Sequence, residues 1–160
     1  MQKIKLQSIR IVELTNVVDA ISSKDLSTVK DVRLNVNLVE DLRKANQALT
    51  TMVEDFNVKR DAILKPYQQE YVEKSQGLEE EEAKALSAEL DKKMNEEQKE
   101  VLLATKPAQE AIEAASKEVV EFELSDDKFA KLKEWVEKFG VAKFSNKKAF
   151  LEVCDALNIE

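Results

Sequence analysis

The chain has 160 residues, of which 43% are hydrophobic and 36% charged, with a formal net charge of −7 and no histidine. It is too apolar for a disordered protein, and its length allows one ordinary core or a small core with an elongated extension. Two glycines and two prolines are too few for sheet-rich proteins or glycine-rich nucleotide loops, so the composition predicts a few long helices.

The first predicted elements are a short strand and a helix. Residues 3–6, KIKL, alternate polar and apolar side chains, which is typical of a strand with one buried face. From residue 8 to residue 21 the apolar spacing becomes helical, and Ser8 is available as the N-cap. Residues 22–26 interrupt this helix.

A long helix is predicted from Ser27, a suitable N-cap, to residue 64. Its apolar stripe consists of Val29, Val32, Val36, Val39, Leu42, Ala45, Leu49, Met52, Phe56 and Ile63. Pro66 lacks an amide donor, but Tyr67 and Tyr71 continue the apolar face. We therefore expect a kink or a restarted helix at Pro66 rather than an end.

Gly77 lies in the turn that we expect near residues 75–78, because glycine readily adopts the left-handed conformation that ends helices. A second long helix follows, with a local break at Pro107. Its stripe consists of Ala83, Leu86, Leu90, Met94, Val101, Ala104, Ala108, Ala111 and Ala115. Two long stripes joined by a short polar turn predict an antiparallel helical hairpin.

The last segment predicts a strand and two helices. Residues 120–124, VEFEL, alternate again, and the returning chain would pair them with the first strand. Ser125 and Ser145 are candidate N-caps, and Gly140 is the expected C-cap of the first helix. The expected fold is mainly α in a single domain. A compact α+β base (residues 1–26 and 118–160) contains a two-stranded sheet and two C-terminal helices, and a long antiparallel hairpin (residues 27–117) projects from it.

The residues that most enzymes need are missing. Without histidine the chain lacks the commonest general base and the commonest zinc ligand, and its two glycines have no partner for a phosphate loop. Cys154 lies between apolar neighbours and is interpreted as a buried core residue. We therefore expect no enzyme activity, no catalytic residues, no bound metal and no cofactor.

The negative charge is concentrated in residues 70–123, which carry 7 basic and 16 acidic side chains. The candidate partner-binding glutamates in this stretch are Glu79, Glu80, Glu81, Glu82, Glu89, Glu96, Glu97 and Glu100. The cluster at residues 79–82 has three interpretations: a solvated helix start, which acidic residues stabilise, a protein-docking patch, or a divalent-metal site. Consecutive residues on a helix point in different directions, which disfavours the metal. An acidic mimic of nucleic acid is a further alternative, although lysines interrupt the charge.

Trp135, Phe139 and Phe144 form the aromatic concentration of the chain. They are candidates for an interaction hot spot, with the core of the base as the alternative. The long apolar stripes could also pair between protomers, so a homo-oligomer is considered. No stretch is long and apolar enough to cross a bilayer, no signal peptide is expected, and no strongly basic segment predicts nucleic-acid binding.

The plan of the chain resembles that of small uncharacterised proteins of tailed bacteriophages. The resemblance is carried by MQKIKLQSIRIVELTNVVDAISSKDL, VEDLRKANQALTTMVEDFNVKRDAILKPY and VVEFELSDDKFAKLKEW, whereas the tail SNKKAFLEVCDALNIE departs from that group. It implies a phage protein located in the bacterial host cytoplasm or in the virion, and it offers no known activity to carry over to this chain. The resulting hypothesis is a protein-binding module with a host or phage partner, acting as an inhibitor such as an anti-defence protein or as an assembly component. Two alternatives to it are the acidic mimic of nucleic acid and, less favoured, a carboxylate enzyme that uses a divalent metal.

Overall fold

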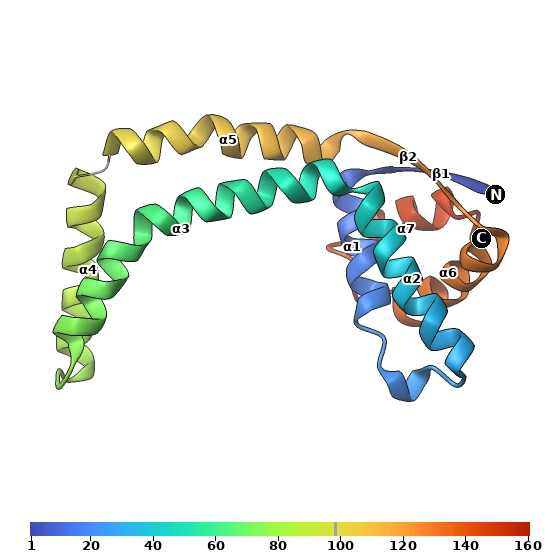
Figure 1. The fold of residues 1–160 in the computed structure, drawn as a ribbon, viewed down its shortest axis with the longest axis horizontal. Coiled ribbons are helices and arrows are strands. Elements are labelled where there is room, and N and C mark those ends of the chain that lie inside the picture. Colours follow the sequence, from blue (N-terminus) through green and yellow to red (C-terminus); the bar gives the residue numbers. More distant parts are fainter. Residues whose placement is uncertain (98) are drawn as a thin grey trace. The chain divides into compact units, whose positions relative to one another are not determined.

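The computed structural model describes every residue except 98, and the side chains of residues 100–102 and 104 are likewise outside the described part. In the described chain it contains seven α-helices and a two-stranded sheet, which confirms a mainly α fold with a small sheet (Figure 1). The chain divides into two units. Unit 1 comprises Met1–Thr50 and Ala114–Glu160, and unit 2 comprises Thr51–Glu113.

The sheet of unit 1 pairs the two predicted strands, β1 (Gln2–Gln7) and β2 (Val119–Leu124), in antiparallel register. Ile4 lies opposite Phe122 and turns toward the core, where it is fully buried. On the solvent face, Lys5 forms an ion pair of 3.3 Å with Glu121. The alternation seen in the sequence therefore separates a buried apolar face from a charged outer face.

Helix α1 (Ser8–Asp19) follows β1 without a linker. The predicted N-cap was wrong by one residue, because Gln7 occupies the cap position. Ser8 is buried instead, and its backbone N–H donates to the carbonyl of Glu118 at 2.9 Å, which extends the strand pairing into the helix. A short 3₁₀ helix (Ser23–Asp25) then leads toward α2.

Helix α2 (Val29–Ala45) packs on α1 and belongs to unit 1. Its N-cap is Thr28 rather than Ser27, since the Thr28 hydroxyl accepts from the backbone N–H of Asp31 at 3.1 Å. The helix ends at Ala45, with Asn46 as its C-cap, so the single helix expected over residues 27–64 is two helices. Because the buried side chains of α2 join the core of unit 1, the unit boundary falls near residue 50 instead of residue 27.

Helices α6 (Asp126–Phe139) and α7 (Lys147–Ala156) complete unit 1. Asn146, not Ser145, caps α7, because its side-chain oxygen accepts from the backbone N–H of Ala149 at 2.8 Å. The core gathers apolar side chains from both strands and from α1, α2, α6 and α7. Its fully buried members of largest volume are Ile4, Ile11, Leu14, Leu38, Leu42, Leu124, Leu132 and Leu157.

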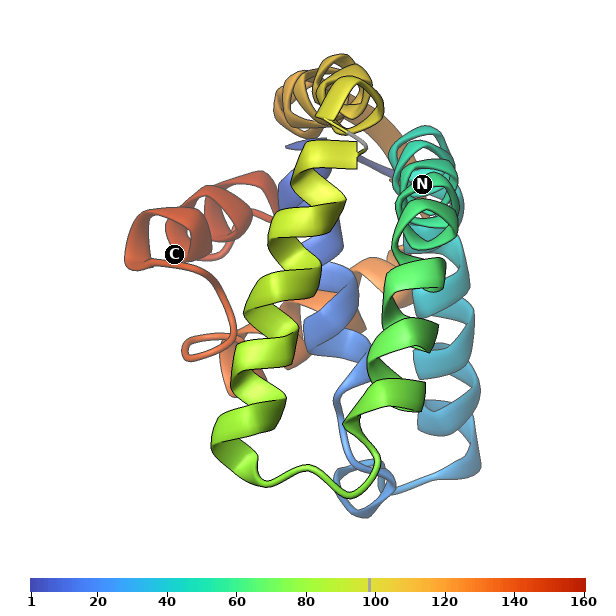
Figure 2. The same ribbon diagram turned by 90° about the vertical axis from the view of Figure 1, so that its left-hand side faces the viewer.

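The described part of unit 2 consists of helices and one turn. Helices α3 (Gln47–Ser75) and α4 (Glu80–Glu97) run antiparallel on either side of a short turn (Figure 2), and α5 (Lys99–Lys117) follows. Pro66 lies inside α3, which changes direction in its second half, and Pro107 lies inside α5 (Figure 1). The stretch in which the sequence predicts the second long helix contains α4 and α5, on either side of residue 98, which lies outside the described part. Glu100, Val101 and Ala104 belong to α5, but their side chains are outside the described part.

Candidate functional site

The turn between α3 and α4 depends on Gly77, whose φ of 78° lies in the left-handed region. The backbone N–H of Leu78 donates to the carbonyl of Ser75 at 3.1 Å, and the N–H of Ala83 donates to the carbonyl of Glu79 at 2.9 Å. These bonds close one helix and open the next, as the sequence predicted for residues 75–78. The turn sets the two helices side by side along their apolar stripes.

A groove of about 450 Å³ lies between the second half of α3 and the middle of α4, and we call it the hairpin groove. Its walls are mainly aliphatic and aromatic, with a few polar side chains among them. The lining residues are Leu64, Tyr67, Gln68, Tyr71, Val72, Ser87, Leu90, Asp91 and Met94. Leu90 is only 6% exposed, whereas Val72 is 59% exposed. The two stripes therefore meet at the base of the groove without covering it.

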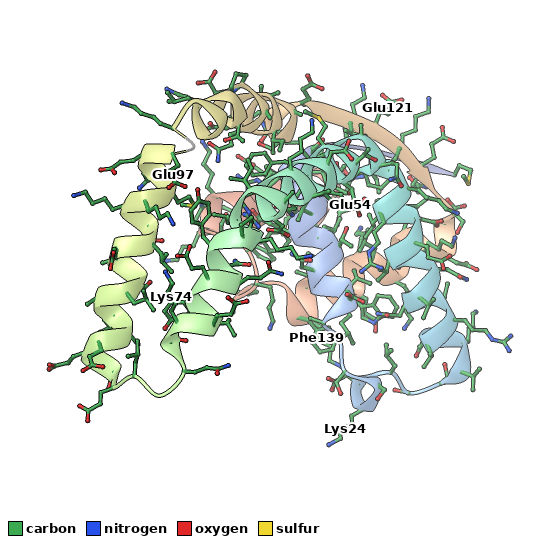
Figure 3. All side chains as sticks on the ribbon, turned by 60° about the vertical axis from the view of Figure 1, so that its left-hand side comes forward. Lys24, Glu54, Lys74, Glu97, Glu121 and Phe139 are labelled. Atoms are coloured by element: carbon green, nitrogen blue, oxygen red, sulfur yellow. The ribbon has the colours of Figure 1, made fainter. Side chains whose placement is uncertain are left out.

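Polar contacts tie the two walls together. The Lys93 ammonium on α4 lies 3.5 Å from a carboxylate oxygen of Glu70 on α3, and the other oxygen of Glu70 accepts from Lys74 at 2.6 Å. The hydroxyl of Tyr67 donates to the carboxylate of Glu97 at 3.1 Å. Figure 3 labels Lys74, the second-last residue of α3, and Glu97, the last residue of α4. Each of these two contacts between α3 and α4 thus links one wall of the groove to the other.

The charge of the Glu70–Lys74 pair follows from this geometry. The hydrogen bond from Lys74 lowers the pKa of the Glu70 carboxyl, partial desolvation opposes the shift, and the charges of Lys74 and Lys93 reinforce it. The same hydrogen bond raises the pKa of Lys74. Both groups are therefore ionised at neutral pH, and Glu70 is already engaged by two lysines.

The predicted acidic residues lie at the turn before α4, along α4 and, in the case of Glu100, in α5. Glu79, Glu80, Glu81 and Glu82 are exposed at the turn, where Glu80 pairs with Lys84 at 3.1 Å. Glu89 and Glu96 are exposed, Glu97 accepts from Tyr67, and the side chain of Glu100 is outside the described part. Across the described residues, no three His, Cys, Asp or Glu side chains form a group that could hold a metal ion.

The aromatic candidates lie in unit 1. Trp135 is 3% exposed and Phe144 8% exposed, and both belong to the core cluster, while Phe139 is partly buried against it. In this arrangement the three rings fill the core and offer little surface to a partner. Cys154 is also buried, and desolvation raises the pKa of its thiol, which disfavours the reactive thiolate.

Sequence reasoning found the apolar stripes but not the hairpin groove. In the sequence, Tyr67 and Tyr71 show only that the first stripe continues, and nothing distinguishes Val72. Their signal was the persistence of apolar side chains beyond Pro66, opposite Leu90 and Met94. The ion pair between Glu70 and Lys93 and the hydrogen bond between Tyr67 and Glu97 had no signal in the sequence, since each joins residues more than 20 positions apart.

The chain was compared with protein-family models, with curated proteins and with solved structures, and none of them matches. Among the described residues, no helix combines the length and the apolar character needed to cross a membrane.

Proposed function

We propose that this chain is a non-enzymatic protein–protein interaction module and that the hairpin groove of unit 2 is its contact site. One observation carries the proposal: two long helices meet along apolar side chains yet leave a groove of about 450 Å³ open between them. Apolar clefts with a polar rim are the usual form of binding sites on proteins. Burying exposed side chains such as Val72 would stabilise a complex by about 25 cal/mol per Å² of apolar surface removed from water.

The charge distribution supports unit 2 as the contact element. Unit 2 carries 9 basic and 16 acidic side chains, so the net charge of −7 falls within it, and unit 1 is balanced at 16 of each. Such a field selects partners of opposite sign and accelerates their association. It also favours one second candidate, an acidic mimic that occupies the nucleic-acid site of a basic protein.

The setting that we propose follows from the resemblance to tailed-phage proteins. In a bacterial cytoplasm the module would dock on a host complex as an inhibitor, such as an anti-defence protein. In a virion or its assembly intermediates it would join phage components. Both roles need a protein partner and no chemistry, and they differ only in the source of that partner.

A matched pair of variants tests the module. Val72 lines the groove, whereas Val58 lies on α3 about 21 Å away along the helix, and both valines are highly exposed at 59% and 69%. Val72→Lys should abolish the retention of a partner in pull-downs from bacterial lysate or from phage-infected cells, and Val58→Lys should leave it unchanged. Circular dichroism checks that both variants keep their helices.

The pull-downs also discriminate between the alternatives. A partner found only in infected cells supports the assembly role, and one found in uninfected lysate supports inhibition of a host complex. If this chain and DNA compete for the same site on a basic nucleic-acid-binding protein, that result would support the acidic mimic. Retention of no protein from either source, or equal loss with both valine variants, would refute the proposal.

A further inference from the structure

A partner in the hairpin groove can be recognised only by side chains, because the walls of the groove are two helices. Their lining residues lie within α3 and α4, where backbone N–H and C=O groups are already paired along each helix. The strands β1 and β2 both belong to unit 1. A partner therefore cannot add a strand to these walls and must instead insert apolar side chains between them.

The length of the groove matches a short helical stripe. The lining runs from Leu64 to Val72 on α3 and from Ser87 to Met94 on α4, which is about 10–12 Å at a rise of 1.5 Å per residue. A partner helix presents apolar side chains at positions i, i+4 and i+7 over about the same distance. Tyr67, Tyr71 and Met94 suit such anchors, because aromatic rings bury large areas and methionine adapts to irregular shapes.

The charges around the groove specify the flanks of that helix. Asp91 lines the wall, the exposed Glu89 and Glu96 lie on the same helix α4, and the described unit is strongly acidic overall. Of the nearby lysines, Lys74 and Lys93 are engaged with Glu70. A basic partner would gain favourable electrostatics, whereas a second copy of this chain would bring another acidic hairpin against the first.

We propose that the hairpin groove binds an amphipathic α-helix with three apolar anchors on one face and lysine or arginine residues on its flanks. The inference rests on the proposed function and names the chemistry of the partner. Binding buries the anchors against Tyr71, Val72 and Met94, while the basic flanks pair with Asp91 and neighbouring glutamates. The groove walls and the ligand together form a three-helix arrangement with a closed apolar seam.

The test uses the full chain and synthetic fluorescent peptides of about four helical turns. The first peptide has leucines on one face and lysines elsewhere, the second has the same composition in scrambled order, and the third replaces every lysine with glutamate. Fluorescence anisotropy should show binding of the first peptide, at least about tenfold weaker binding of the scrambled one, and none of the acidic one. Added salt should weaken the first complex.

Variants and NMR locate the complex. Val72→Lys and Asp91→Lys should each weaken the first peptide by about tenfold, whereas Val58→Lys should not change its affinity. The methyl signal of Met94 should move on titration while that of Met1 in unit 1 stays in place. Because Val58, Val72 and Asp91 are all exposed, the variants should keep the helical circular dichroism of the parent chain.

Several results would overturn the inference. Equal binding of the ordered and scrambled peptides would mean unspecific charge attraction, and a Met94 signal that does not move would place the peptide elsewhere. Light scattering that shows a dimer lost in Val72→Lys would assign the groove to a second copy of the chain. If no peptide binds but capture from lysate remains sensitive to Val72→Lys, the basic-helix partner is refuted and the proposed function stands.

Discussion

At the residue scale, the two glycines serve different physical needs. Gly77 has a positive φ, and a Cβ atom there would meet no other atom within 4 Å, so its role is conformational. Gly140 has an ordinary φ of −83°, but a Cβ atom there would lie 2.5 Å from the carbonyl oxygen of Val136. The same atom would lie 3.3 Å from the rings of Phe144 and Phe150. Glycine is therefore required at this C-cap because there is no room for a Cβ atom.

This difference predicts the size of two mutational effects. Gly77→Ala should reduce the free energy of unfolding by about 1 kcal/mol, the cost of a left-handed alanine. Gly140→Ala should cost about 1–3 kcal/mol, because a backbone carbonyl and two packed rings must shift. Urea unfolding followed by circular dichroism measures both values. Gly77→Asn is the control, since asparagine tolerates positive φ and should cost less than alanine; an unchanged stability in Gly140→Ala would contradict the packing argument.

At the element scale, Asn46 explains why one predicted helix became two. Leu42 and Leu49 are seven residues apart and both buried, so the apolar period passes from α2 to α3 without a visible break. The cause is a tertiary contact: the Asn46 side-chain amide is buried and donates to the carbonyl of Ser8 at 3.3 Å. Periodicity in a single segment carries no information about such a partner.

At the prolines, by contrast, the sequence contains a breaking signal but the helix continues. Pro66 and Pro107 are strong breaking signals, yet each lies inside a helix. At Pro66 the sequence did contain the decisive information, since Tyr67 and Tyr71 continue the stripe and now line the hairpin groove. Strands, turn and stripes were thus predictable from local pattern. The groove was not, because its width depends on how two distant stripes meet.

The ion pairs of the hairpin predict a pH dependence. Folding lowers the pKa of Glu70, so its ionised form stabilises the hairpin above the ordinary glutamate range, and this contribution is lost as the pH falls through the folded pKa. Carbon NMR of the side-chain carboxyl measures that pKa directly. Lys74→Met should raise it more than Lys93→Met does, because the hydrogen bond from Lys74 is the largest cause of the shift. A larger effect of Lys93→Met would contradict this ranking.

At the scale of the whole molecule, stability and recognition are divided between the two units. Every member of the buried apolar cluster lies in unit 1, whereas among the described side chains of unit 2 only Leu90 is buried. In unit 2, apolar side chains line an open groove and remain partly exposed. An isolated helical hairpin of this kind is marginally stable in water, so we expect unit 2 to unfold locally before unit 1 does.

This division predicts that unit 1 folds without the hairpin. Removing residues 51–113 would leave two chain ends, at Thr50 and Ala114. Ser8 contacts a residue near each of these ends, because its N–H donates to the carbonyl of Glu118 and its own carbonyl accepts from Asn46. Thr50 and Ala114 each lie about one helical turn from these contacts, so about eight glycine and serine residues can replace residues 51–113.

The shortened chain should keep a cooperative thermal transition and the fluorescence of a buried Trp135, because all the partners of that ring in the core cluster remain. Its net charge should change from −7 to zero, since the charged residues of unit 1 balance. Ion-exchange chromatography measures that change. It should also lose the groove-dependent partner. A shortened chain with no cooperative transition would show instead that the core of unit 1 depends on the hairpin, and stability and recognition would then be coupled properties of one folding unit.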